Sequence, residues 1–369
     1  MEKRPPGTIA KTKARGASLN ENHRFTNMRM EIDPGVFDEL SEEERPLLHT
    51  QFFKDASRSI LNKNDSPDLG FGFSVNFYRG CEHGCIYCYA RPTHEYLNLS
   101  AGLDFESKIF VKEQAPQLLR QEFMAKRWQP QVVMMSGVTD CYQPAERQFK
   151  ITRECLKVFN QFRNPVSIIT KNALVTRDID ILKELAEKHC VSVTLSITSL
   201  NDQVAKVMEP RASVPAARLK AITALAENGI PVSVNVAPIV PGITDHEIPV
   251  ILKAAADAGA QSAGYVVVRL PYSVKDLFVD WLERHFPEKK SRVLALIRDM
   301  RGQKLYDANF GTRMTGVGQN AENIVQMFYV FRKKYGLDRH RDYLSLDNFR
   351  RPSDQTDLFQ WVESSLDNE

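Results

Sequence analysis

The stretch from Asn76 to Arg91 reads N-F-Y-R-G-C-E-H-G-C-I-Y-C-Y-A-R and holds three of the six cysteines of the chain. Cys81, Cys85 and Cys88 have the spacing C-x3-C-x2-C, so one short loop can direct three thiolates at a single point. Soft thiolate ligands select zinc or iron–sulfur clusters. A closed structural zinc site uses four protein ligands, and a conventional 4Fe-4S cluster takes four cysteines. A loop with three thiolates therefore leaves one metal position open for another ligand.

Two other interpretations use the same cysteines. A disulfide framework is not expected in a chain without a secretory signal, and three clustered cysteines cannot all pair with one another. A Cys3His zinc knuckle with His83 or His94 as the fourth ligand stays open, and it would make the protein a non-catalytic, zinc-stabilised module that binds nucleic acid. The context favours a cluster, because the loop follows a strand-like run over residues 73–78 and precedes repeated strand–helix units.

Length and composition are those of a soluble globular protein. The chain has 369 residues, of which 43% are hydrophobic and 26% charged, enough for one large α/β domain with appendages. No apolar run approaches the roughly 20 residues that span a bilayer, and no apolar segment follows the charged N-terminus. We therefore expect a cytoplasmic protein without a membrane partner. The net charge of +3 is too small to indicate nucleic-acid binding by itself.

Tyr87, directly before the third cysteine, completes a loop that resembles the cluster loop of the radical SAM superfamily. The segments 78–81, 89–91, 139–140, 142–144 and 170–172 together resemble its DNA-repair-photolyase-like branch, which is related to spore photoproduct lyase. This resemblance implies one 4Fe-4S cluster on the three cysteines, whose open iron binds S-adenosylmethionine (SAM). It also implies reductive cleavage of SAM to a 5′-deoxyadenosyl radical. The electron would come from an external donor such as a flavodoxin or a ferredoxin.

Strand and helix patterns alternate along the middle of the chain. Strands are predicted over residues 132–135, 166–170, 191–197, 232–240 and 263–270, and helices over 146–162, 178–188, 216–228 and 245–258. With the run before the cysteines this makes six units, which predict an α/β fold with a parallel sheet and right-handed crossovers. Six units fit the partial (β/α)6 barrel, of TIM type, that the superfamily shares. Amphipathic helices are predicted over 274–286, 292–300 and 322–335.

These patterns also predict a domain organisation. Residues 1–66 form a polar N-terminal arm and lead-in, residues 67–272 the barrel, residues 273–350 a helical C-terminal extension, and residues 351–369 a flexible tail.

The C-terminal ends of the strands form the active mouth of such a barrel, so candidate ligands follow each strand. The resemblance implies that SAM contacts the following residues: Tyr87, Asp140, Lys171, Ser196, Thr198 and Gly242. Some of them also have a structural interpretation. Asp140 suits a helix N-cap, Lys171 a solvated lysine, and Ser196 and Thr198 are small hydroxyl residues of a kind common at strand ends. Gly242 lets the backbone approach a planar group closely. Glu209, Arg211 and Arg218 predict an ion-pair network near the mouth, either functional or structural.

Cys141 is the candidate catalytic residue. The related lyase returns a hydrogen atom from a cysteine, but this chain has Gly137 at the corresponding place. Cys141 lies a few residues further on, at the same rim. The alternative is a reduced cysteine that only packs, as we also expect for Cys155 and Cys190.

The expected substrate and partners follow from the resemblance, from a basic, aromatic-bearing region over residues 331–341, and from the tail. Nucleic acid is the expected partner, with repair of a DNA lesion or modification of a base as the reaction; radical modification of RNA or protein is the alternative. Gln355, Leu358 and Phe359 form a Q-x-x-L-F segment that resembles the peptide by which bacterial repair proteins bind the sliding clamp. The alternative is that these side chains fold back on the barrel.

Overall fold

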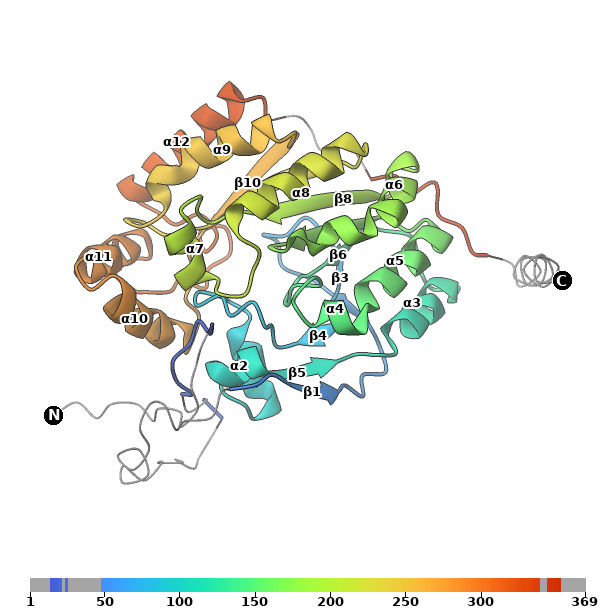
Figure 1. Ribbon diagram of the computed structural model, residues 1–369, viewed down its shortest axis with the longest axis horizontal. Coiled ribbons are helices and arrows are strands. Elements are labelled where there is room, and N and C mark those ends of the chain that lie inside the picture. The colour runs from blue at the N-terminus through green and yellow to red at the C-terminus, as the bar shows by residue number, and fades with distance from the viewer. Residues whose placement is uncertain (1–13, 22–23, 26–47, 339–343, 353–369) are drawn as a thin grey trace.

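A seven-stranded sheet forms the centre of the protein (Figure 1). The computed structural model describes residues 14–21, 24–25, 48–338 and 344–352. Strands follow the order β10-β9-β8-β7-β6-β3-β2. Six of them run parallel: β3 (Phe73–Val75), β6 (Val133–Met135), β7 (Val166–Thr170), β8 (Val191–Ser196), β9 (Val232–Ile239) and β10 (Ser262–Val267). β2 (Leu61–Lys63) pairs antiparallel with β3 at one edge. The predicted α/β fold of partial (β/α)6 type is confirmed.

Helices connect the parallel strands and cover their outer face (Figure 1). They are α3 (Ala115–Met124), α5 (Ile151–Phe162), α6 (Ile179–Glu187), α8 (Pro215–Glu227) and α9 (Ile248–Asp257). Helix α5 shows why they pack there. Its Ile151, Cys155, Phe159 and Phe162 recur at a helical spacing and are buried in the main core. α3 is absent from the sequence-based assignment, although its buried Ala115–Leu119–Phe123 row has the same spacing.

Two predicted elements are each divided in the structure. The predicted helix over residues 146–162 is broken at Lys150, whose φ of 54° separates α4 (Glu146–Phe149) from α5. The predicted strand over residues 73–78 is broken at Asn76. There the side-chain Oδ1 accepts a hydrogen bond from the Val138 amide at 2.7 Å. After this break, β4 (Tyr78–Arg79) joins a small second sheet with β1 (Gln51–Lys54) and β5 (Lys108–Val111).

The C-terminal helices complete the fold. α10 (Val274–His285) and α11 (Lys290–Met300) form a second core with the cysteine loop, in which Phe278 and Trp281 are fully buried. α12 (Gln319–Lys334) packs on α9 and β10. An ion pair between Arg313 and Asp68 links the chain after α11 to the turn between β2 and β3, and so connects the two edges of the open sheet.

The domain boundaries given above stay a prediction, although β1 and β2 lie within residues assigned to the arm and lead-in. Among the residues that the structure describes, no helix is long and apolar enough to cross a membrane.

Candidate active site at the cysteine loop

The cysteine loop leaves β4 through two glycines in left-handed conformations. Gly80 has φ of 81° and Gly84 has φ of 68°. A Cβ at Gly80 would lie 2.9 Å from the Phe105 carbonyl oxygen, and one at Gly84 would lie 2.8 Å from a Glu106 carboxylate oxygen. Both positions therefore require glycine. The backbone can thus turn sharply on each side of Cys81.

The three cysteines of the loop are free thiols. Cys81 and Cys85 are buried, and Cys88 is half-buried. Burial raises the pKa of all three, and the neighbouring thiols raise the pKa of Cys81 further. Within the described ranges, no group of three or more His, Cys, Asp or Glu side chains is arranged to hold a single metal ion.

A buried guanidinium group holds the backbone of the cysteine loop in place. Arg91 is fully buried and donates to the carbonyl oxygens of Gly84 at 3.2 Å and Cys85 at 2.9 Å. Its charge is paired with Glu106 at 2.5 Å. The same carboxylate accepts from the backbone amides of residues 16 and 17 at 3.0 and 2.9 Å. The conformation of the loop is therefore tied to a charge pair that water does not reach.

Gln143 fixes the other side of the loop. Its fully buried amide accepts from the Glu82 amide at 2.9 Å and donates to the Gly80 carbonyl oxygen at 3.2 Å. Gln143, in the loop after β6, therefore fixes the backbone of Gly80 and Glu82, the two residues that flank Cys81.

The two histidines proposed as zinc ligands have other partners. His94 Nε2 lies 2.9 Å from the Lys108 carbonyl oxygen, and its ring packs edge-on against Phe105. Burial lowers the pKa of His94 to about 4. His83 lies between Asp140, at 3.4 Å, and Asn172, at 3.2 Å. Burial also lowers the pKa of His83, so its imidazole is neutral at pH 7.

Glu209 contacts three of the predicted site residues. Its carboxylate accepts from the Tyr87 hydroxyl, from the Thr198 hydroxyl at 2.6 Å, and lies 3.5 Å from Lys171 Nζ. Arg218 forms an ion pair with it from the other side. Burial opposes ionisation of Glu209, but the two cations and the hydroxyl donors hold its pKa at about 2. Glu209 and Arg218 of the predicted network are therefore paired, and Lys171 joins them, whereas Arg211 pairs instead with Glu82 at 2.9 Å.

Ser196 joins this group through its backbone. Its carbonyl oxygen accepts from Arg218 at 2.8 Å. The side chain belongs to the inner face of the sheet, because Val193 and Leu195 on the alternate face pack in the main core. Register aligns Ser196 with Asn235 of β9, and Asn235 with Gly264 of β10. The interior of the barrel is therefore lined there by small and polar groups.

Asp140 connects the ends of two strands. Its carboxylate accepts from the Tyr142 amide at 2.8 Å, the Thr170 hydroxyl at 2.7 Å and the Lys171 amide at 2.8 Å. Asp140 is therefore not the helix N-cap that the structural interpretation predicts, because the N-cap of α4 is Ala145. The bonds to Thr170 and Lys171 place the Asp140 carboxylate beside the Lys171 backbone.

The other two predicted residues lie apart from this group. Gly242 has φ of 78°, and a Cβ there would contact Val293 and Leu296 of α11 at 3.4 and 3.3 Å. Cys141 is 2% exposed and packs in the main core. That environment is the one expected for a packing cysteine, and a role in hydrogen-atom return stays a prediction.

Exposed aromatic side chains, with the exposed Arg24 and the half-buried Arg269, lie next to the cysteine loop. Tyr89, 49% exposed, donates to the Gly137 carbonyl oxygen at 2.6 Å and lies under Arg269 at 5.6 Å. Nearby in the chain, Tyr96 is 70% exposed. The Arg24 guanidinium lies 5.3 Å from the Tyr96 ring and 4.0 Å from the Tyr272 ring. We call these five residues the aromatic–arginine collar.

Two important positions escape sequence reasoning. Glu106 lies in a short helix, α2 (Leu103–Ser107), with no motif around it, and only the buried Arg91 reveals its purpose. Gln143 belongs to a segment that carries the family resemblance. Its hydrogen bonds, however, reach Glu82 and Gly80, which precede it by 61 and 63 positions, so only the fold brings these residues together.

Comparison with known proteins agrees with this geometry. A family model described as the radical SAM superfamily matches residues 75–255. An uncharacterized protein of Mycobacterium tuberculosis is 36% identical over 244 residues, which cover 65% of this chain and 72% of that protein. An uncharacterized protein of Methanocaldococcus jannaschii is 29% identical over 238 residues, which cover 64% of this chain and 85% of that protein.

Solved structures of one enzyme share the fold. Spore photoproduct lyase complexed with dinucleoside spore photoproduct superposes with a TM-score of 0.57 and 16% identity, over 77% of this chain and 79% of that chain. A mutant of the same lyase with bound AdoMet and dinucleoside spore photoproduct gives a TM-score of 0.56 and 15% identity, over 77% and 78% of the two chains.

The Glu209 network predicts a pH-dependent stability. Glu209→Gln leaves Arg218 and Lys171 without their buried partner, so we expect a loss of about 3–5 kcal/mol at pH 7. The folded-state pKa of about 2 lies below the ordinary 4.5. The difference from wild type is therefore complete above about pH 4.5 and shrinks as the pH falls towards 2. Urea unfolding between pH 7 and pH 3 measures it, with the exposed Glu227→Gln as control. Equal stability of Glu209→Gln and wild type at pH 7 would contradict the prediction.

Proposed function

The chain belongs to the radical SAM superfamily and is an enzyme of that class, and on this premise we propose that it cleaves SAM reductively to start radical chemistry on a base of a nucleic acid. Membership of an enzyme family decides against the non-catalytic zinc module. The proposal has three parts: the cluster, the SAM-binding wall and the substrate.

The donor set suits a 4Fe-4S cluster. Cys81, Cys85 and Cys88 would hold it, because they are free soft donors on one loop whose backbone Arg91 and Gln143 fix. Burial raises the pKa of these thiols, so they need a bound cationic centre to become thiolates, and coordination to metal supplies that compensation. Three thiolates satisfy three of the four irons.

Lys171 is the residue that we assign to the carboxylate of SAM. Its Nζ donates to the Ala237 carbonyl oxygen at 2.9 Å and lies beside Glu209, and the side chain keeps 16% of its surface exposed. The Glu209 carboxylate holds the Lys171 ammonium in place, and Arg218 forms an ion pair with the same carboxylate. Tyr87, Thr198, Ser196, Asp140 and Gly242 are assigned to the remaining polar groups and the adenine. Cluster and SAM together, when bound, supply a one-electron cleavage of the sulfonium that starts radical chemistry.

The proposed substrate class rests on the aromatic–arginine collar. Aromatic faces beside guanidinium groups suit unpaired bases and their phosphates, because rings stack on bases while cations meet the backbone. Four of the five collar residues lie in or directly after the cysteine loop or after the last parallel strand. RNA has the same faces and phosphates, so modification of RNA is the second candidate.

The external electron donor stays part of the proposal. The sequence has only three cysteines outside the loop, and they are widely spaced, so a second cluster within the chain is not expected. A small flavodoxin or ferredoxin would supply the electron. A reducing, cytoplasmic setting suits such a centre.

SAM binding tests the role of Lys171. Lys171→Met removes one charged hydrogen bond, so we expect about 10- to 100-fold weaker SAM binding and a matching loss of 5′-deoxyadenosine at low SAM. Equilibrium binding and product analysis of the anaerobically reconstituted protein measure both. Lys220→Met, on the exposed face of α8, serves as the control with unchanged binding. Wild-type affinity in Lys171→Met with normal iron content would remove Lys171 from the site.

Oligonucleotide binding tests the collar. Loss of one stacking ring costs about 1–3 kcal/mol, so Tyr96→Ala should weaken binding of single-stranded DNA roughly 5- to 100-fold, and affinity should fall steeply with salt. Tyr329→Ala is the matched control, because Tyr329 is 53% exposed on the outer helix α12. Parallel titrations with RNA decide between the two polymers. No binding of either polymer at low salt would end the nucleic-acid proposal.

The sliding clamp is proposed as a partner of the tail. Gln355, Leu358 and Phe359 lie outside the described residues, so this proposal rests on the sequence alone. We expect the double variant Leu358→Ala, Phe359→Ala to lose at least most of its capture by purified clamp, because a few apolar anchors carry most of the energy of such peptides. Leu366→Ala, in the same tail, is the control. Equal recovery of all three proteins would exclude the clamp.

A further inference from the structure

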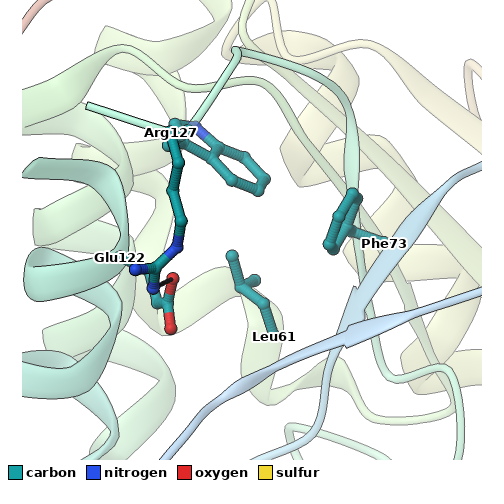
Figure 2. A pocket seen from close by; sticks show the side chains of 5 residues that line it. Leu61, Phe73, Glu122 and Arg127 are labelled. Atoms are coloured by element: carbon teal, nitrogen blue, oxygen red, sulfur yellow. Dashed lines mark hydrogen bonds and ion pairs between the residues drawn. The ribbon is translucent and has the colours of Figure 1, made fainter. Parts of the chain in front are cut away.

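Figure 2 shows a pocket, whose volume is about 300 Å³. It lies at the end of the sheet opposite the cysteine loop. Its walls are Leu61, Phe73, Glu122, Arg127 and Trp128. Phe73 is the first residue of β3, and Trp128 precedes β6, whereas the cysteine loop follows the other end of the strands. The pocket therefore belongs to no part of the proposed active site.

The floor of the pocket is apolar and aromatic. The rings of Phe73 and Trp128 meet edge-on with centroids 5.2 Å apart. Trp128 Nε1 donates to Asn164 at 3.1 Å, so the only polar atom of the indole already has a partner. Figure 2 shows Leu61 and Phe73 pointing into the same space from one side. Such a surface is suited to an apolar side chain.

The lining of the pocket carries one ion pair, and two lysines lie next to lining residues in the chain or in the sheet. The Arg127 side chain is 77% exposed and pairs with Glu122 at 2.9 Å. An exposed pair of this kind contributes little stability, and it leaves Arg127 able to meet a second carboxylate. Lys126 precedes Arg127, and Lys63 pairs with Phe73 across the β2–β3 ladder. An acidic ligand with apolar side chains would complement these cations and the apolar floor.

The described chain ends beside this pocket. Arg351 donates to the carbonyl oxygens of Trp128 at 2.8 Å and Ala125 at 3.1 Å, and Phe349 packs against Phe123. Residues 353–369 follow. They contain no Lys, Arg or His, and their acidic residues are Asp354, Asp357, Glu363, Asp367 and Glu369.

The length of chain permits contact. Phe359 is eight residues beyond Arg351, and an extended chain covers about 3.3–3.6 Å per residue, or roughly 26–29 Å. The pocket wall lies within hydrogen-bond distance of Arg351 itself. Holding the two on one chain gives a local concentration on the order of millimolar.

We propose that residues 354–361 of the same chain bind this pocket, with Phe359 on the apolar floor and Asp357 at Arg127. This inference is independent of the radical chemistry, and it identifies an intramolecular docking surface for an acidic, apolar segment. The contact explains why an aromatic pocket with lysines next to its lining residues lies where the acidic end of the chain leaves the fold.

Hydrogen exchange of the intact protein tests the proposal. A segment that is docked nine-tenths of the time slows exchange beneath it about tenfold. Exchange at residues 120–131 should therefore be about tenfold faster in Leu358→Ala, Phe359→Ala and in Arg127→Glu than in wild type. Arg127→Glu should add nothing to the tail variant, because both changes break one contact. Lys220→Glu, the same charge reversal on α8, should match wild type. Identical exchange in all variants would overturn the proposal.

A photo-cross-linking amino acid at position 359 identifies the occupant. We expect an adduct within one chain to peptides that contain residues 61–73 or 122–131, lost in Arg127→Glu and retained in Lys220→Glu. Mixed light and heavy isotope-labelled protein separates adducts within a chain from those between chains. An adduct between chains would assign the pocket to a second copy, and an adduct elsewhere would leave it without this occupant; either result overturns the proposal.

Discussion

The buried charge pair of Arg91 and Glu106 is the interaction on which the cysteine loop depends. A guanidinium without water must have its donors satisfied and its charge compensated. Arg91 meets both needs with the carbonyls of residues 84, 85, 101 and 102 and with Glu106. Because two of these carbonyls flank Cys85, satisfying the arginine also sets the path of the backbone between the cysteines. Glu106 in turn binds the chain at residues 16 and 17, and so fixes part of the N-terminal segment.

A second group of buried charges, centred on Glu209, lies beside the cysteine loop and makes the adjoining surface polar. Glu209 is held ionised between Arg218 and Lys171, and Tyr87 from the cysteine loop donates to it. The loop and the strand ends are thereby joined through one carboxylate. The parallel sheet explains how residues so distant in sequence meet, since Lys171 follows the C-terminal end of β7 and Glu209 lies in the connection after β8. One side of the site carries the three thiols, and we propose that the other side binds a charged organic ligand.

Sequence alone predicted the fold because the strands from β6 to β10 are short apolar or alternating runs at regular intervals, with helical periodicity between them. It located the three cysteines and most of the residues around Glu209, because a family motif and the ends of predicted strands point to them. It did not predict the ion pair of Glu106 with Arg91 or the hydrogen bonds of Gln143 to the cysteine loop, since these depend on single residues that meet only after folding. It also missed the break at Asn76, where a side-chain bond to the loop after β6 outweighs the strand propensity of residues 73–78. The pocket near Trp128 had no sequence signal.

Iron and sulfide content tests the central claim most directly. After anaerobic reconstitution, removal of unbound metal and elemental analysis, we expect about four iron and four acid-labile sulfide per chain. Cys85→Ala should lose nearly all of both, while Cys155→Ala should keep them, because Cys155 packs in the main core far along the chain from the loop. One tightly bound zinc per chain, with no sulfide, would contradict the account.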